Sequence, residues 1–196
     1  MRFLSGVIVG VAGVLVAGFL LANGGRMNLA ATQHGGWNDR LDHWLSQVSR
    51  RSIEKHAASA TNPYAADPAA AAAGLAHYRE NCLACHGARD VDTAEFAKGL
   101  NPGPPMLDMD DVQKMSDGEL FWVVANGLRA TGMPAFAPTH SPREIWQIVA
   151  FVRHLPRLSE AETSALKKGQ PEEGAHHDES HGGAEKAPAD SRPPSR

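Results

Sequence analysis

Two cysteines occur in the sequence, Cys82 and Cys85, and His86 follows the second of them directly. This order and spacing is the C-x-x-C-H pattern by which a c-type haem is attached to a chain. The two thiols are spaced to form thioethers with the two vinyl groups of one porphyrin, and His86 is then held against one face of the iron. Because the chain has no other cysteine, it can attach one haem in this way.

Two other roles are open to the same three residues. A C-x-x-C pair could form a disulfide, but in a redox enzyme the pair lies near a strand–helix pattern, and none is visible here. The cysteines could bind zinc together with His86, but structural zinc requires four ligands, and a second closely spaced Cys/His pair is missing from the ordered-looking part of the chain. The pentapeptide therefore favours haem.

An iron that only carries electrons needs a sixth ligand, which is commonly methionine. Met133 is the best candidate, because Gly132 permits an unusual turn and Pro134 fixes the following φ, so that the loop can hold the thioether rigidly. Met1 is the start residue and Met27 belongs to the juxtamembrane stretch. The other methionines lie amid polar residues or at a short helix start, where gap-filling or surface roles suit them: Met106, Met109 and Met115.

Further motifs surround the pentapeptide in a defined order. They are Gly74-x-x-x-Tyr78-x-x-x-Cys82, Cys82-Leu-Ala-Cys85-His86-Gly87, Gly103-Pro104-Pro105-Met106-Leu107, Gly132-Met133-Pro134 and Ile145-Trp146-x-x-x-Ala150-Phe151-Val152. With these motifs, residues 62–158 resemble a class I cytochrome c domain, and the run from Asp117 to Phe136 resembles membrane-attached bacterial monohaem cytochromes. The resemblance implies an all-α fold, with three to four main helices around one covalent haem c.

The resemblance also implies roles for several residues around the haem. In the family, a proline carbonyl accepts a hydrogen bond from the second nitrogen of the iron-bound histidine, which orients the ring. Here the acceptor would be Pro104 or Pro105, and the choice stays open; the alternative is that both prolines only stiffen a loop. Tyr78 and Trp122 are candidates for lining the haem pocket, or they are ordinary core aromatics.

Three helices are predicted to build this domain. The alanine-rich stretch 68–85 favours a helix with Gly74 and Tyr78 on one face. A serine cap, a proline and an apolar stripe predict a second helix at 141–155, which we expect to cross the first at Gly74 and Tyr78. A third helix is predicted at 116–127, where a serine and a glutamate form a capping box.

The N-terminal region 1–23 is predicted to be a single transmembrane helix. Residues 3–22 carry no charge, and at about 1.5 Å per residue they would span about 30 Å, the thickness of a bilayer core. Arg2 precedes them, so the rest of the chain is expected on the outer side of a bacterial inner membrane, with the haem domain in the periplasm. The alternative is a cleaved signal peptide, although such segments are shorter and no clear cleavage site follows.

Two further segments flank the predicted domain. Residues 24–61 form a linker in which Leu41, Trp44, Leu45 and Val48 indicate a short amphipathic helix. This helix either rests on the membrane or docks a partner, or it packs on the haem domain. The tail 159–196 has no aromatic residue and is predicted to be disordered. Its three histidines either capture a divalent metal weakly or are incidental: His176, His177 and His181.

Charge limits the class of partner. The net charge of −3 does not favour nucleic acid. Residues 62–158 contain eight Lys or Arg and eleven Asp or Glu, so they lack the strongly basic face of soluble cytochromes that dock acidic oxidases. We therefore expect the donor and acceptor to be redox proteins associated with the membrane, held by proximity or apolar contact.

The predicted function is electron transfer without substrate chemistry. With His86 and Met133 on the two axial sites, no site is left for a substrate, so the chain is expected to be a carrier, or the cytochrome subunit of an oxidoreductase, and not itself an enzyme. Two alternatives remain: a haem sensor or haem enzyme subunit with a labile sixth ligand, and a metal-binding or structural module.

Overall fold

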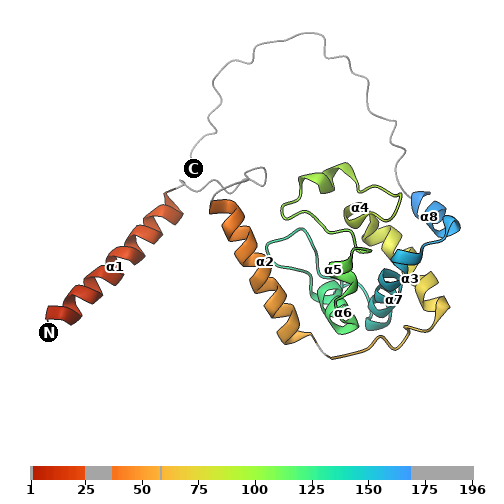
Figure 1. Cartoon of the computed structure of the whole chain (residues 1–196), viewed down its shortest axis with the longest axis horizontal. Helices are drawn as coiled ribbons and strands as arrows, with labels where there is room; N and C mark the ends of the chain where they lie inside the picture. Colours follow the sequence, from red (N-terminus) through yellow and green to blue (C-terminus); the bar gives the residue numbers. More distant parts are fainter. Residues whose placement is uncertain (1, 25–36, 58, 169–196) are drawn as a thin grey trace, which may run out of the picture.

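The computed structural model describes residues 2–24, 37–57 and 59–168, and within these ranges the chain is helical, without a strand (Figure 1). The helices are α1 (Arg2–Asn23), α2 (Trp37–His56), α3 (Pro68–Asn81), α4 (Leu83–His86), α5 (Asp110–Gln113), α6 (Asp117–Asn126), α7 (Pro142–His154) and α8 (Glu160–Lys167). Two 3₁₀ turns accompany them, η1 (Glu95–Gly99) and η2 (Leu155–Arg157). The predicted all-α class is confirmed for the described residues.

The crossing of α3 and α7 forms the centre of the domain. A Cβ atom placed on Gly74 would lie 2.0 Å from the carbonyl oxygen of Gln147 and 2.8 Å from the Cβ of Phe151, so only glycine lets the two backbones come this close. One turn later, the ring of Tyr78 lies 5.2 Å from the ring of Phe151. The predicted crossing at Gly74 and Tyr78 is therefore confirmed.

Capping boxes begin the two helices that complete this core. In α7, the Glu144 amide donates to the Ser141 hydroxyl and the Ser141 amide donates to the Glu144 carboxylate at 2.7 Å. The same reciprocal pair starts α6, with Ser116 and Glu119. Such a box satisfies amides that otherwise have no partner at a helix start.

The first predicted helix is shorter than expected. It was predicted to continue to residue 85, but α3 ends at Asn81 and the separate turn α4 begins at Leu83. At Cys82 the φ angle is −114°, well away from the α-helical value of about −63°. Cys82 therefore lies between the two helices, and Cys85 and His86 lie within α4.

The C-terminal region departs from the predicted disorder. Residues from 159 onward were expected to lack structure, but α8 starts with a capping box between Ser159 and Glu162. Leu166 is fully buried in the core, and Nε2 of His154 lies 2.9 Å from Oε1 of Glu162. One buried leucine and a local cap thus outweigh the polar composition. The stretch from 169 onward, with its three histidines, lies outside the described residues.

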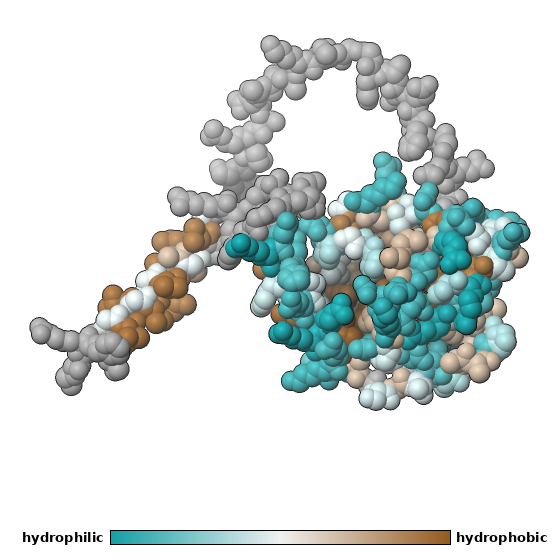
Figure 2. Space-filling model, viewed as in Figure 1, coloured by the Kyte–Doolittle hydropathy of each residue, from teal (hydrophilic) through white to brown (hydrophobic). Residues whose placement is uncertain are grey.

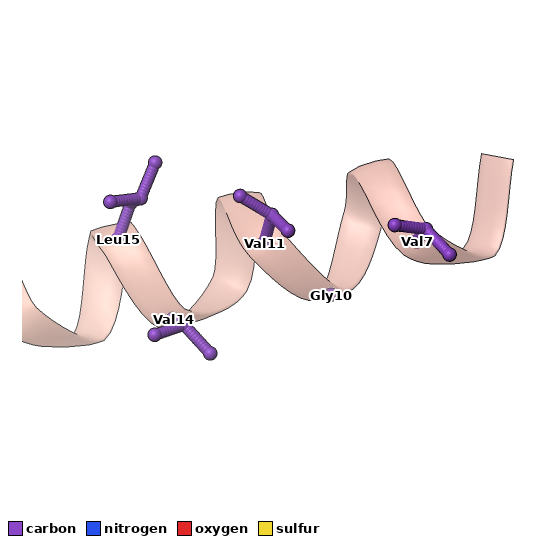
Figure 3. A pocket seen from close by; sticks show the side chains of 5 residues that line it. All are labelled: Val7, Gly10, Val11, Val14 and Leu15. Carbon is purple, nitrogen blue, oxygen red and sulfur yellow. The ribbon is translucent and has the colours of Figure 1, made fainter. Parts of the chain in front are cut away.

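Helix α1 covers the segment predicted as a transmembrane anchor. Among the described residues, however, no helix combines the length and the apolar character that crossing a membrane requires, so that prediction is not confirmed. Brown, hydrophobic side chains lie along α1 in Figure 2, and glycines interrupt them. Figure 3 shows one flank of the helix, where Gly10 leaves a gap in a row of apolar residues: Val7, Val11, Val14 and Leu15.

Helix α2 packs on the outside of α6. Ile53 is 9 % exposed, and the ring of His56 stacks on Trp122 with 6.5 Å between the ring centres. Of the two roles left open for this helix, packing on the domain is therefore confirmed. The same helix leaves Trp44 and Val48 exposed on another face.

Candidate haem site

Cys82 directly precedes α4, and Cys85 lies within it. Cys82 is buried and Cys85 half-buried, and both are free thiols. Burial, with a smaller contribution from Cys85, raises the pKa of Cys82 to about 12, so this thiol is neutral at neutral pH. The nucleophilic cysteine of a C-x-x-C oxidoreductase has a lowered pKa instead. Among the described residues, no group of three or more His, Cys, Asp or Glu side chains is arranged to hold a metal ion.

His86 is held in the orientation that a metal ligand requires. Its side chain is 9 % exposed, and Nδ1 lies 2.8 Å from the carbonyl oxygen of Pro105. Because a carbonyl can only accept, Nδ1 carries the proton, and the lone pair of Nε2 is left free. Burial lowers the pKa of His86, and the bond to Pro105 opposes this, so the ring is neutral at neutral pH. Of the two candidate prolines, Pro105 is the acceptor in the structure.

Tyr78 fixes the chain immediately after His86. Its hydroxyl donates to the carbonyl of Gly87 at 2.6 Å, deep in the core. Burial raises the pKa of Tyr78, so the phenol stays protonated and remains a donor. Gly87 has a φ of 59°, and a Cβ there would lie 2.9 Å from the carbonyl of Val91, so glycine is required at this turn. Tyr78 therefore supports the end of the C-x-x-C-H turn.

Met133 lies in a loop that hydrogen bonds close on itself. The amide of Met133 donates to the hydroxyl of Thr131 at 3.0 Å, and that hydroxyl donates to the carbonyl of Leu128 at 2.8 Å. A Cβ on Gly132 would lie 3.0 Å from the side chain of Leu100, so the two loops meet there. The Met133 side chain is half-buried against the core. The loop is thus held by hydrogen bonds of Thr131, and the predicted unusual turn at Gly132 is wrong, since the positive φ of this loop, 61°, belongs to Ala130. The role of Met133 as an iron ligand stays a prediction.

Gln113 anchors the loop that carries Pro105, and the sequence did not indicate it. Its side-chain amide donates to the carbonyl of Leu107 at 2.7 Å and to the carbonyl of Val152 at 2.9 Å. Leu107 lies two residues after Pro105, and Val152 belongs to α7. One amide group therefore ties the loop beside His86 to the central helix.

Arg153 of α7 connects that helix to residues 113–117, which follow the same loop. Its Nε lies 2.9 Å from Oδ1 of Asp117, its Nη1 donates to the carbonyl of Gln113 at 2.7 Å, and its Nη2 donates to the carbonyl of Met115. Asp117 also accepts from the backbone amide of Asn62 at 3.1 Å. Arg153 lies at least 36 residues from each of its three partners, which is why no local pattern pointed to this cluster.

Trp122 occupies a different position from the other predicted site residues. It is half-buried on α6, where it stacks on His56 of α2. This contact with His56 does not test whether Trp122 lines the haem pocket, so that role stays a prediction.

The residues present fit a covalent haem. The two free thiols stand beside a neutral imidazole whose Nε2 is available, and the methionine loop is held by its own hydrogen bonds. The family model described as cytochrome c oxidase, cbb3-type, subunit III matches residues 69–152, a range from the start of α3 almost to the end of α7. No curated protein matches the chain. Residues 69–152 therefore form a class I c-type cytochrome domain, which carries covalently bound haem c.

Proposed function

We propose that this chain carries single electrons between redox proteins at the outer side of a bacterial inner membrane, with one haem c held by Cys82, Cys85, His86 and Met133. The observation that carries the proposal is the hydrogen bond from Nδ1 of His86 to Pro105 at 2.8 Å. It leaves Nε2 as the free nitrogen, next to two thiols at the spacing of haem attachment.

The chain's own residues have defined tasks in this proposal. When bound, haem supplies reversible exchange of one electron at its iron. Cys82 and Cys85 hold the porphyrin, and the bond to Pro105 keeps the imidazole of His86 in one orientation. The thioether of Met133 favours the ferrous state and so raises the potential. With His86 and Met133 both holding the iron, these residues would limit rearrangement and would leave no place for a substrate.

The partners are proposed from the family match and from charge. The matched family is described as a subunit of a cytochrome c oxidase, which supports a place in or beside a respiratory oxidase complex. Residues 62–158 contain more acidic than basic side chains, so cationic steering toward an acidic partner has little support. We expect electron transfer with the true partner to slow only weakly as salt is added, and a steep decline would contradict this.

Association with a membrane is part of the proposal and rests on α1. The Val, Leu and Ile side chains from Val7 to Leu21 are at least half exposed, including Val9 at 70 % and Val14 at 73 %. Apolar surface of this extent is favourable only against lipid or another apolar surface. Membranes from cells that make the full chain are expected to retain it after a salt wash, and a chain lacking residues 2–23 is expected to be released.

The test of the haem assignment uses purified full-length protein after expression with haem-attachment machinery. We expect one haem per chain that survives denaturing electrophoresis, one reversible one-electron wave, and no carbon monoxide binding to the ferrous form. Binding of carbon monoxide by the unmodified protein would instead favour a sensor or enzyme subunit with a labile sixth ligand. Colourless protein would refute the proposal altogether.

A further inference from the structure

Helix α2 presents two different faces. The inner face meets the cytochrome domain near the end of the helix, where Ile53 is buried and His56 stacks on Trp122, and it continues through the half-buried Leu41, Leu45 and Ser49. These positions recur at helical spacing, so they share one side of the helix. The C-terminal part of the helix is therefore held against α6.

The outer face combines apolar and basic side chains. Positions i, i+4, i+8, i+11 and i+15 of a helix fall on one stripe. In α2 this stripe is Arg40, Trp44, Val48, Arg51 and Lys55, all of them exposed, and we call it the outer stripe. Trp44 is 59 % exposed and Val48 is 41 % exposed. The acidic residues of α2 lie off the stripe, so the stripe itself is cationic.

This composition fits one kind of surface. A tryptophan places an apolar ring and a polar N–H at the boundary between lipid and water. Arginine and lysine are attracted to the anionic headgroups beside it, and their long stems cover apolar surface while their charges stay in water. A soluble acidic protein could satisfy the charges, but it would not require an isolated tryptophan and valine between them.

We propose that the outer stripe of α2 lies on the anionic headgroups of a phospholipid bilayer, while its inner face holds the cytochrome domain. This inference rests on the proposed membrane association. Helix α2 begins after residues 24–36, a segment that reaches at most about 45 Å even when fully extended, so the start of α2 stays close enough to α1 to meet the same surface. The domain would then sit in one orientation on the membrane, with α2 as the spacer between haem and lipid.

The test uses the haem-loaded full chain, labelled with 5-fluorotryptophan, in nanodiscs made of phosphatidylglycerol and phosphatidylcholine. The ferrous form is used so that the iron does not broaden the fluorine resonances, and Trp44→Phe identifies the Trp44 signal. A gadolinium chelate attached to lipid headgroups is expected to broaden Trp44 more strongly than Trp122 or Trp146, which lie half-buried in the domain.

Charge variants separate lipid docking from simple exposure. Replacing Arg51 and Lys55 together by glutamine should lower the ratio of docked to undocked protein by roughly 25-fold, and the Trp44 broadening should fall accordingly. Arg50→Gln is the matched control, because Arg50 is also exposed on α2 but lies off the stripe. It should leave most of the broadening in place.

Two results overturn the inference. In the first, the lipid-attached gadolinium leaves the fluorine resonance of Trp44 sharp, while a water-soluble gadolinium chelate broadens it. In the second, neither probe broadens the Trp44 resonance, which would indicate that protein covers this side chain. Failure of the membrane proposal looks different, because the chain would then not co-elute with the nanodiscs at all. A disc-bound chain with Trp44 away from lipid refutes only the role of the outer stripe.

Discussion

Replacing Gly74 by alanine tests the crossing on which the site depends. The added methyl carbon would lie 2.0 Å from the carbonyl oxygen of Gln147 and 2.7 Å from its carbonyl carbon. Both atoms are backbone within α7, so a change of rotamer cannot relieve the contact. We expect α3 and α7 to be forced apart where they now touch.

The size of the effect follows from two opposed contributions. Alanine in place of glycine inside a helix should stabilise α3 by about 1 kcal/mol. Inserting a methyl group into a closely packed site costs about 1–3 kcal/mol, and occasionally more. Because the contacts at Gly74 are with backbone, the cost should lie at the upper end. The expected net loss in the free energy of unfolding is therefore about 2 kcal/mol.

The measurement is guanidinium unfolding of the haem-loaded protein, followed by far-ultraviolet circular dichroism. Gly99→Ala is the matched control, since a Cβ at Gly99 has no atom within 4 Å. The control should leave the midpoint nearly unchanged, while Gly74→Ala should lower it. A Gly74→Ala protein as stable as the parent, or more stable, would show that helix propensity outweighs the crossing and would refute the reasoning.

Three further predictions concern the site and its supports. Met133→Ala should lower the reduction potential and let the ferrous form bind carbon monoxide, both measured optically; an unchanged spectrum and potential would reject Met133 as the ligand. Tyr78→Phe leaves the buried carbonyl of Gly87 without its donor, which should cost about 1–3 kcal/mol in chemical unfolding; no loss would mean that this bond is dispensable. The Ser141 amide, and then its hydroxyl, lower the pKa of Glu144. Its stabilising effect should thus be present above about pH 4.3 and be lost as the pH falls through its lower folded-state pKa. Unfolding of Glu144→Gln measured against pH should show a flatter acid side, and an identical profile would contradict the assignment.

Local patterns were enough to predict several features correctly. Ser116 and Ser141 each precede a glutamate by three residues, and both capping boxes are present because their geometry involves a single helical turn. Gly74 was informative for another reason. A glycine in an alanine-rich helix costs stability, so its presence signalled a close neighbour, and α7 is that neighbour.

Features made by distant residues were not predictable in the same way. The choice between Pro104 and Pro105 depends on which carbonyl faces His86. Two adjacent prolines in a loop are the same residue type, so the sequence does not indicate which of their carbonyls points toward the ring. Arg153 joins residues separated by at least 36 positions. Its partners are mostly backbone carbonyls, which every residue has, so the sequence carries no mark of them.

Helix α8 was not predicted, because the average composition of residues 159–196 is polar and indicates disorder. Leu166 contributes a fully buried side chain, but its effect was averaged with the polar residues that follow. Ser159 and Glu162 have the same capping-box spacing that predicted the starts of α6 and α7. A short local signal was thus outweighed in the prediction by a long segment average.

Both supports of His86 lead to α7. The position of the histidine is set by α3, which packs on α7 at Gly74, and the ring orientation is set by the Pro105 loop, which Gln113 ties to the carbonyl of Val152. The loop of Met133 is attached elsewhere, through amides that donate to carbonyls of α6. Because the two supports of the imidazole share one helix, they cannot move independently of each other. If Met133 holds the iron as proposed, a change in the position of its loop would require only the loop and its bonds to α6 to shift, whereas a change at His86 would require α7 to shift as well.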